Sequence, residues 1–143
     1  MRKRLVKKDR SVVVNKGSSV LIEAAITAKK GSAEGFSNIA SEVHEAKNSG
    51  KEVVMVSSGA IAMGIAKLEL ISNKSSSIPK RQAIAAVGQV DLMTRYDAAF
   101  KKRGEKVGQI LLTHDDFSNR TRFLNARNTN TTLLSLGIVP IVN

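Results

Sequence analysis

The sequence contains no cysteine and only two histidines, His44 and His114. Disulfide frameworks and thiolate metal sites both require cysteine, so neither can form in this chain. Two isolated histidines also supply too few imidazoles for a histidine-based zinc site. We therefore expect no metal bound by cysteine or histidine side chains.

Aromatic residues make up 3% of the chain, and tryptophan is absent. Proteins that bind single-stranded nucleic acid stack bases on aromatic side chains, so this composition disfavours such a partner. The net charge of +11 would otherwise favour nucleic acid, but six basic residues and one acidic residue crowd into residues 1–10. We interpret residues 1–10 as a solvated basic tail and expect no nucleic-acid partner.

Long apolar runs and the common phosphate and hydrolase motifs are also absent. No run approaches the roughly 20 apolar residues of a membrane span, and the basic start MRKRLVKKDR is not followed by the apolar stretch of a signal peptide. We therefore expect no membrane association and a cytoplasmic location. The chain contains no glycine loop ending in Gly-Lys-Ser/Thr, no Gly-x-Gly-x-x-Gly and no Gly-x-Ser-x-Gly, which excludes the common nucleotide loops and disfavours acyl hydrolysis.

What the chain does contain is 42% hydrophobic residues, enough for the core of one domain. β-Branched runs predict strands at 11–15, 51–57, 106–113 and 138–143. Helical spacing predicts helices over 34–49, within 58–70, and over 79–102 and 118–137. Strands that alternate with helices favour a mostly parallel sheet with helices on both faces, which is a three-layer α/β/α sandwich.

Every unusual polar cluster follows one of the predicted strands. The clusters are NKGSS at 15–19, SSGA at 57–60, THDD at 113–116, and Asn143 after the last strand. Ligands of parallel α/β sheets bind beyond the carboxyl ends of the strands. The clusters therefore outline one candidate site at one edge of the sheet.

Each cluster also has a purely structural interpretation. The GSS turn offers backbone N–H groups and hydroxyls to a phosphate, but glycine and serine also mark ordinary turns. The serines before the second helix could help to hold an anion or could cap the helix. Asp115 and Asp116 could bind a metal, but adjacent aspartates before a helix more often cap it, and we favour that interpretation.

The clusters lie within five longer motifs, GSSVL, VSSGAIAMG, QAIAAVGQVDLM, GQILLTHDDFSNRTRFLNARNT and GIVPIVN. In this order and at this spacing, the chain from about residue 12 to residue 143 resembles the glutamate 5-kinase branch of the amino-acid kinase family. AAVGQ together with RFLNARNT distinguishes this branch from the aspartate, carbamate and uridylate kinases. The resemblance implies an amino-acid kinase-like fold that is incomplete at the C-terminus, with residues 11–143 as the N-terminal, amino-acid-substrate half of the kinase domain.

The resemblance also implies a reaction and a set of ligands. The reaction is the ATP- and Mg²⁺-dependent phosphorylation of the γ-carboxylate of L-glutamate to glutamyl 5-phosphate, in proline biosynthesis. Proline is the implied feedback inhibitor, and the implied assembly is a homo-oligomer. The implied ligands of the phosphoryl group are Gly17, Ser18 and Ser19, and those of glutamate are Ser58, with Gly59 and Ala60 alongside, and Asn143.

One departure from the family pattern affects the phosphate loop. The family reads Val-Val-Lys-x-Gly-Ser/Thr-Ser, whereas Asn15 stands here at the lysine position and Lys16 follows it. Strand side chains alternate between faces, so Lys16 could replace that lysine only if the strand bulged by one residue. We expect Asn15 to impair catalysis, with Lys16 as the candidate substitute.

A second departure is that the sequence stops at Asn143. The family continues into an Asn-Asp segment that finishes the glutamate site, and then into a half that binds the nucleotide and supplies another catalytic lysine. We therefore expect this chain by itself to be an inactive fragment of the kinase. The alternative is a non-catalytic module that binds glutamate or proline, or that serves oligomerisation.

Overall fold

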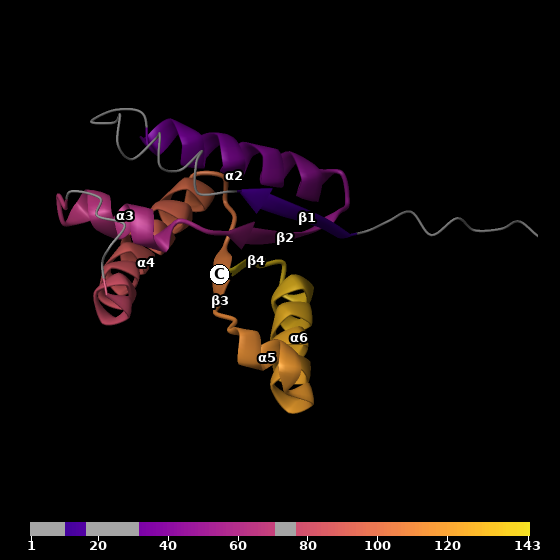
Figure 1. The fold of residues 1–143 in the computed structure, drawn as a ribbon. Coiled ribbons are helices and arrows are strands. Elements are labelled where there is room, and N and C mark those ends of the chain that lie inside the picture. Colours follow the sequence, from indigo (N-terminus) through magenta and orange to yellow (C-terminus); the bar gives the residue numbers. More distant parts are fainter. Residues whose placement is uncertain (1–10, 17–31, 71–76) are drawn as a thin grey trace, which may run out of the picture.

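The computed structural model describes residues 11–16, 32–70 and 77–143, and leaves the side chains at positions 15, 16, 32 and 33 outside that description. The predicted basic tail at 1–10 and the GSS turn at 17–19 lie outside the described residues. In chain order the elements are β1 (Ser11–Lys16), α2 (Ser32–Asn48), β2 (Glu52–Ser57), α3 (Ala60–Lys67), α4 (Ile78–Lys101), β3 (Val107–Ile110), α5 (His114–Ser118), α6 (Arg120–Ser135) and β4 (Val139–Val142) (Figure 1).

The four described strands form one sheet in the order β1-β2-β4-β3, and every pair is parallel. The β1–β2 ladder runs from Ser11 opposite Glu52 to Lys16 opposite Ser57, and the β3–β4 ladder runs from Val107 opposite Val139 to Ile110 opposite Val142. The predicted mixed α/β fold with a parallel sheet is therefore confirmed. All four carboxyl ends meet at one edge of the sheet.

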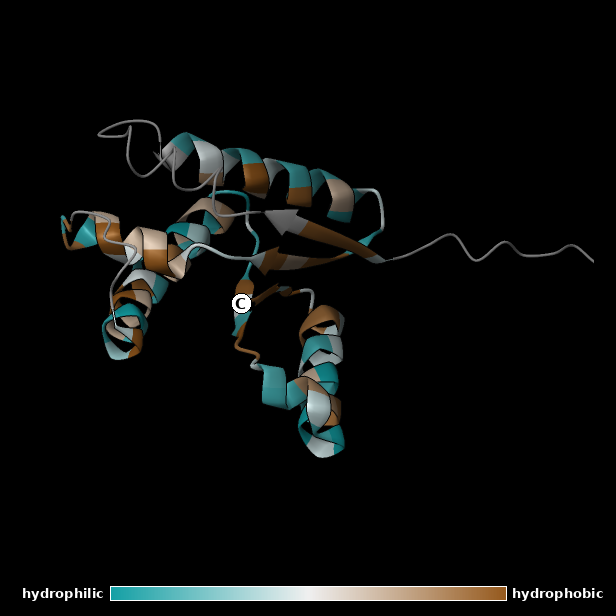
Figure 2. Ribbon diagram, viewed as in Figure 1, coloured by the Kyte–Doolittle hydropathy of each residue, from teal (hydrophilic) through white to brown (hydrophobic). Residues whose placement is uncertain are grey.

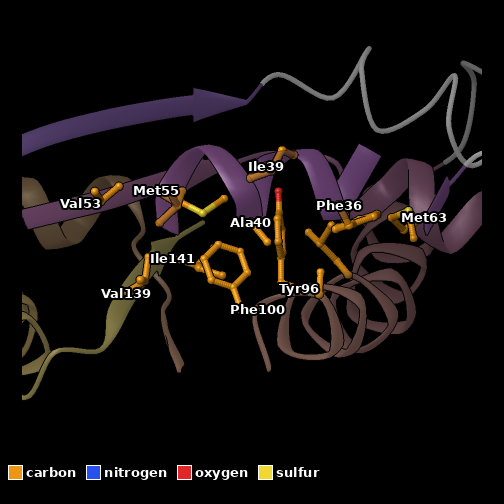
Figure 3. Packing of buried hydrophobic residues seen from close by; sticks show 13 residues of the cluster. Phe36, Ile39, Ala40, Val53, Met55, Met63, Tyr96, Phe100, Val139 and Ile141 are labelled. Carbon is orange, nitrogen blue, oxygen red and sulfur yellow. The ribbon is translucent and has the colours of Figure 1, made fainter. Parts of the chain in front are cut away.

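The main core lies on the face of the sheet that α2 and α4 cover. Figure 2 shows the strands as largely hydrophobic and the helices as mixed in polarity, as expected when strands are covered and helices are half exposed. Tyr96 packs edge-on against Phe36, with ring centroids 4.8 Å apart, and against Phe100 at 6.4 Å (Figure 3). The core cluster comprises Phe36, Ile39, Ala40, Val43, Val53, Met55, Met63, Leu92, Tyr96, Ala99, Phe100, Val139 and Ile141.

Helix α6 lies over the opposite face of the sheet, which gives the predicted three layers (Figure 1). Helix α6 packs less closely against the sheet than α2 and α4 do. A cavity of about 290 Å³ lies between α6 and the strands, with Val54 and Phe123 among its lining residues. Val13 of β1 also lines this cavity and is 66% exposed.

The structure corrects two predicted boundaries. The third strand ends at Ile110 rather than at residue 113, and a short helix, α5, precedes α6 where one helix over 118–137 was predicted. Asn119 has the extended backbone angles φ −100° and ψ 114°, which interrupt the helix, and its Oδ1 accepts a hydrogen bond from Arg122 N at 3.1 Å. The sequence pattern missed α5 because a five-residue helix is too short to show a helical spacing of apolar residues.

Asp116 caps α5, as the favoured interpretation of the aspartate pair predicts. Its Oδ2 accepts hydrogen bonds from the backbone N of Thr113 at 2.6 Å and from the Thr113 hydroxyl at 2.8 Å. These two bonds, the backbone one first, hold the pKa of Asp116 below its usual value. Asp116 therefore has a structural function at the start of a helix.

At the amino edge of the sheet, Glu105 joins α2 to the segment before β3. Its carboxylate accepts a hydrogen bond from Lys47 Nζ and lies 3.0 Å from His44 Nδ1, while its side chain is 12% exposed. Lys47 also donates to the carbonyl of Gly137 at 2.7 Å. Burial by itself would raise the pKa of Glu105, but the hydrogen bonds and charges of Lys47 and His44 outweigh it and lower that pKa.

We expect Glu105→Gln to lower the free energy of unfolding at neutral pH by about 1–2 kcal/mol, because the amide carries no charge to pair with Lys47. A carboxylate with a lowered pKa in the folded state stabilises the fold above its unfolded-state pKa, and this stabilisation is lost as pH falls through the folded-state pKa. The wild-type chain should therefore lose stability below pH 4.5, which is the ordinary pKa of a glutamate side chain, and the variant should lose less stability there. Urea unfolding above and below that pH measures both effects. Glu45→Gln, at an exposed position of α2, is the control. An identical acid dependence in wild type and Glu105→Gln would contradict the prediction.

Candidate functional site

A cavity of about 530 Å³ opens at the carboxyl edge of the sheet, where β2 leads into α3 and β4 ends. Its lining residues are Ser58, Gly59, Ala60, Ile61, Ala62, Ile65, Ala85 and Asn143. All four residues predicted for glutamate binding line this one cavity, although 83 positions separate Ala60 from Asn143 (143 minus 60). Their function as ligands of glutamate stays a prediction.

The start of α3 forms one wall of the cavity. Gly59 is the N-cap residue and has φ 132°, a backbone conformation that favours glycine. Within the described residues no side chain caps this helix, so the serine-cap interpretation of Ser57 and Ser58 is wrong. The first backbone N–H groups of α3, together with the positive end of the helix dipole, favour a negatively charged group.

Ser57 has a structural function at the end of β2. It is 2% exposed, and its Oγ lies 3.0 Å from the hydroxyl of Tyr96. Burial raises the pKa of Tyr96, and the hydrogen bond with Ser57 offsets this only in part. The neutral hydroxyl pair fixes the end of β2 to α4, while the next residue, Ser58, is exposed and lines the cavity.

Two glycines bring the backbones of α3 and α4 into direct contact behind this wall. A Cβ added at Gly88 would lie 1.7 Å from the carbonyl oxygen of Ala60, and one added at Gly64 would lie 2.0 Å from that of Ile84. Real Cβ atoms essentially never come closer than 3.0 Å to a neighbour. The position of the first turn of α3, and with it the wall of the cavity, therefore depends on these two glycines.

Asn143 forms the opposite wall, and its backbone is held on both sides. Its N–H donates to the carbonyl of Ile110 at 2.9 Å, and its carbonyl accepts from the N–H of Leu112 at 3.0 Å. Its side-chain Nδ2 donates to Oε1 of Gln89 on α4. Sequence reasoning missed this function of Gln89, although AAVGQ was part of the recognised pattern, because helical spacing does not show which turn of α4 faces the end of β4.

The predicted phosphate loop is described only up to the end of β1. Gly17, Ser18 and Ser19 lie outside the described residues. The backbone ladder pairs Asn15 with Val56 and Lys16 with Ser57, one residue to one. The strand therefore contains no bulge up to Lys16.

The described residues contain no group of three or more histidine, aspartate or glutamate side chains that could hold a metal ion. The described side chains that line the cavity are neutral, and its helix N-terminus fits an anionic group of a small molecule better than a cation. Across the described ranges, no helix has the length and apolar character to cross a membrane.

Comparison with known proteins shows which family this chain belongs to. The Amino acid kinase family matches residues 8–143. Over its whole length the chain is 48% identical to a glutamate 5-kinase of Geobacter sp. (strain M21) and 46% identical to one of Geobacter sulfurreducens, and it covers 37% of each relative. Over 74% of the chain it is 53% identical to a glutamate 5-kinase of Methanosarcina barkeri, of which it covers 27%. The chain thus spans little more than a third of the relatives that it matches over its whole length.

Proposed function

Because the chain belongs to the amino-acid kinase family, we propose that it is the amino-acid-binding half of a glutamate 5-kinase. In the complete enzyme, the γ-carboxylate of L-glutamate attacks the γ-phosphate of ATP and forms glutamyl 5-phosphate, a step of proline biosynthesis. ATP supplies the phosphoryl group, and Mg²⁺ bound with it neutralises phosphate charge. The residues of this chain hold and orient the attacking carboxylate.

The observation that supports this proposal is the cavity that joins the start of α3 to Asn143. The N–H groups at the start of α3 suit a carboxylate, and the side-chain amide of Asn143 and the hydroxyl of Ser58 suit the polar groups of a small amino acid. Catalysis of phosphoryl transfer depends mainly on positioning and charge neutralisation. We therefore propose that the contribution of this half is to hold and orient glutamate.

The remaining parts of the proposal follow from the family. We propose that the complete protein is a cytoplasmic homo-oligomer, that proline inhibits it at or near the glutamate cavity, and that Gly17, Ser18 and Ser19 hold the phosphoryl group. The chain of residues 1–143 does not turn over by itself, because the matched relatives are much longer. The alternative is a module that binds glutamate or proline, or assembles, without catalysis.

A chimera tests the proposal. Residues 1–143 replace the matching part of the glutamate 5-kinase of Geobacter sp. (strain M21), to which they are 48% identical. We expect glutamate-dependent release of ADP from ATP, with an acyl phosphate that hydroxylamine traps, from the chimera and not from residues 1–143 alone. Asn143→Ala in the chimera is the control that should weaken glutamate binding.

Two outcomes would contradict the proposal. Turnover by residues 1–143 alone would show that these residues are sufficient for catalysis and do not need the second half of the enzyme. A chimera that stays inactive even with a lysine restored at position 15, while residues 1–143 still bind glutamate, would support the non-catalytic module instead.

A further inference from the structure

Gln89 of α4 lies beside the cavity without belonging to its lining, and contacts it through Asn143. Its Oε1 accepts a hydrogen bond from Asn143 Nδ2, while its own Nε2 is buried and has no hydrogen-bond partner within the described residues. A buried donor without a partner is unfavourable for folding. Stability alone therefore does not account for a glutamine at this position.

The contact determines which atom of Asn143 is available to a ligand. The backbone of Asn143 is paired with Ile110 and Leu112, so only the side chain remains to be oriented. An asparagine amide presents an acceptor oxygen and a donor NH₂ group. With the NH₂ group bonded to Gln89, Oδ1 is the acceptor that the amide keeps for a ligand, while the second N–H of the NH₂ group is not used by this bond.

A hydrogen-bond acceptor at this place suits the ammonium group of an amino acid. Among the described residues that line the cavity none carries a negative charge, and Asn143 Oδ1 and the Ser58 hydroxyl are the side-chain oxygens that they offer to a ligand ammonium group. The start of α3 at the other wall suits a carboxylate. The two walls together match a molecule that carries both groups.

We propose that Gln89 is a positioning residue that turns the acceptor of Asn143 toward the cavity and so selects an amino acid over a dicarboxylic acid that lacks the ammonium group. This inference rests on the proposed glutamate site and adds to it a determinant of specificity. Gln89 acts through Asn143 and does not touch the ligand.

The test compares L-glutamate with glutarate, which has both carboxylates but no amino group. NMR titration of the Geobacter chimera gives the affinity for each ligand, and the ratio of the two affinities is the readout. Gln89→Met keeps the length of the side chain and removes the hydrogen bond. We expect the variant to bind glutamate about tenfold more weakly and glutarate within about twofold of wild type, as the loss of one hydrogen bond to a charged group implies.

Three further variants separate positioning from a general structural effect. Gln82→Met makes the same change at an exposed position of α4 and should leave both affinities unchanged. Gln89→Glu keeps an oxygen acceptor for Asn143 Nδ2 and should retain or increase the preference for glutamate, because its negative charge repels the doubly charged glutarate more than the singly charged glutamate. In an Asn143→Ala background, Gln89→Met should have no additional effect on the ratio, because its function passes through Asn143.

The outcomes distinguish this inference from the proposed function. Equal weakening of glutamate and glutarate by Gln89→Met, or an unchanged affinity for both, overturns the positioning function and leaves the glutamate site intact. A wild-type chimera that binds neither ligand overturns the proposed glutamate site, and the inference with it.

Discussion

Adding one methyl group at Gly88 is expected to lower the free energy of unfolding by about 3 kcal/mol or more, at the upper end of the range for overpacking. The added Cβ would lie 1.7 Å from the carbonyl oxygen of Ala60 and 2.3 Å from the backbone N of Gly64. Both neighbours are backbone atoms of α3, so no rotation of a side chain relieves the contact. A loss of stability would be informative, because alanine normally stabilises a helix interior by about 1 kcal/mol relative to glycine. A destabilising Gly88→Ala change therefore indicates a steric clash with α3.

Gly108→Ala provides the matched control for this prediction. A Cβ at Gly108 would meet the two terminal methyl groups of Leu133 at 2.9 and 3.1 Å, and a flexible side chain can move by that amount. We expect a cost of at most about 1 kcal/mol there. Urea unfolding followed by circular dichroism measures both variants.

The effect of Gly88→Ala should extend to the cavity. Helix α3 must move away from α4 to admit the methyl group, and Ala60 in its first turn lines the cavity. The folded fraction of the variant should therefore bind glutamate more weakly than wild type. A Gly88→Ala chain as stable as wild type would show that α3 and α4 do not meet at this glycine.

The order of the elements could be predicted from the sequence because their signals are local. Apolar periodicity and the glycine stops identify α2 and α4, and β-branched runs identify the strands. The shared edge of Ser58 and Asn143 could also be predicted, since parallel strands joined by helices place their carboxyl ends together. These parts of the prediction needed no knowledge of which surfaces touch.

The features that could not be predicted depend on contacts between elements distant in sequence. Gly88 in the sequence is a helical glycine of unknown purpose, and only the approach of α3 explains it. Gln89 is one polar residue among several on α4 until the end of β4 lies beside it. The absence of a serine cap on α3 depends on the backbone angle of Gly59, which composition does not determine.

The largest effect on activity is expected from moving the lysine in the phosphate loop. In the Geobacter chimera, Asn15→Lys combined with Lys16→Val should raise kcat by at least about 100-fold, the scale on which one electrostatic stabiliser of a transition state acts. The KM for glutamate should change little, since the glutamate cavity is lined by other residues. Kinetics with varied glutamate and varied ATP measure the two parameters separately.

The physical reason for this expected rise in kcat is that successive positions of β1 alternate between the two faces of the sheet. The ladder to β2 continues one residue to one as far as Lys16 opposite Ser57, so no bulge exchanges the faces of positions 15 and 16. By the alternation of the strand, position 16 is on the same face of the sheet as Val14, which packs against the core. Position 15 is on the opposite face, with Val13. Asn15→Met with Lys16→Val is the matched control, because it supplies a long side chain at position 15 without charge and should not restore activity. If the unmodified chimera already turns over as fast as the lysine-restored one, Lys16 does neutralise the phosphoryl charge, and the argument from strand alternation is wrong for this loop.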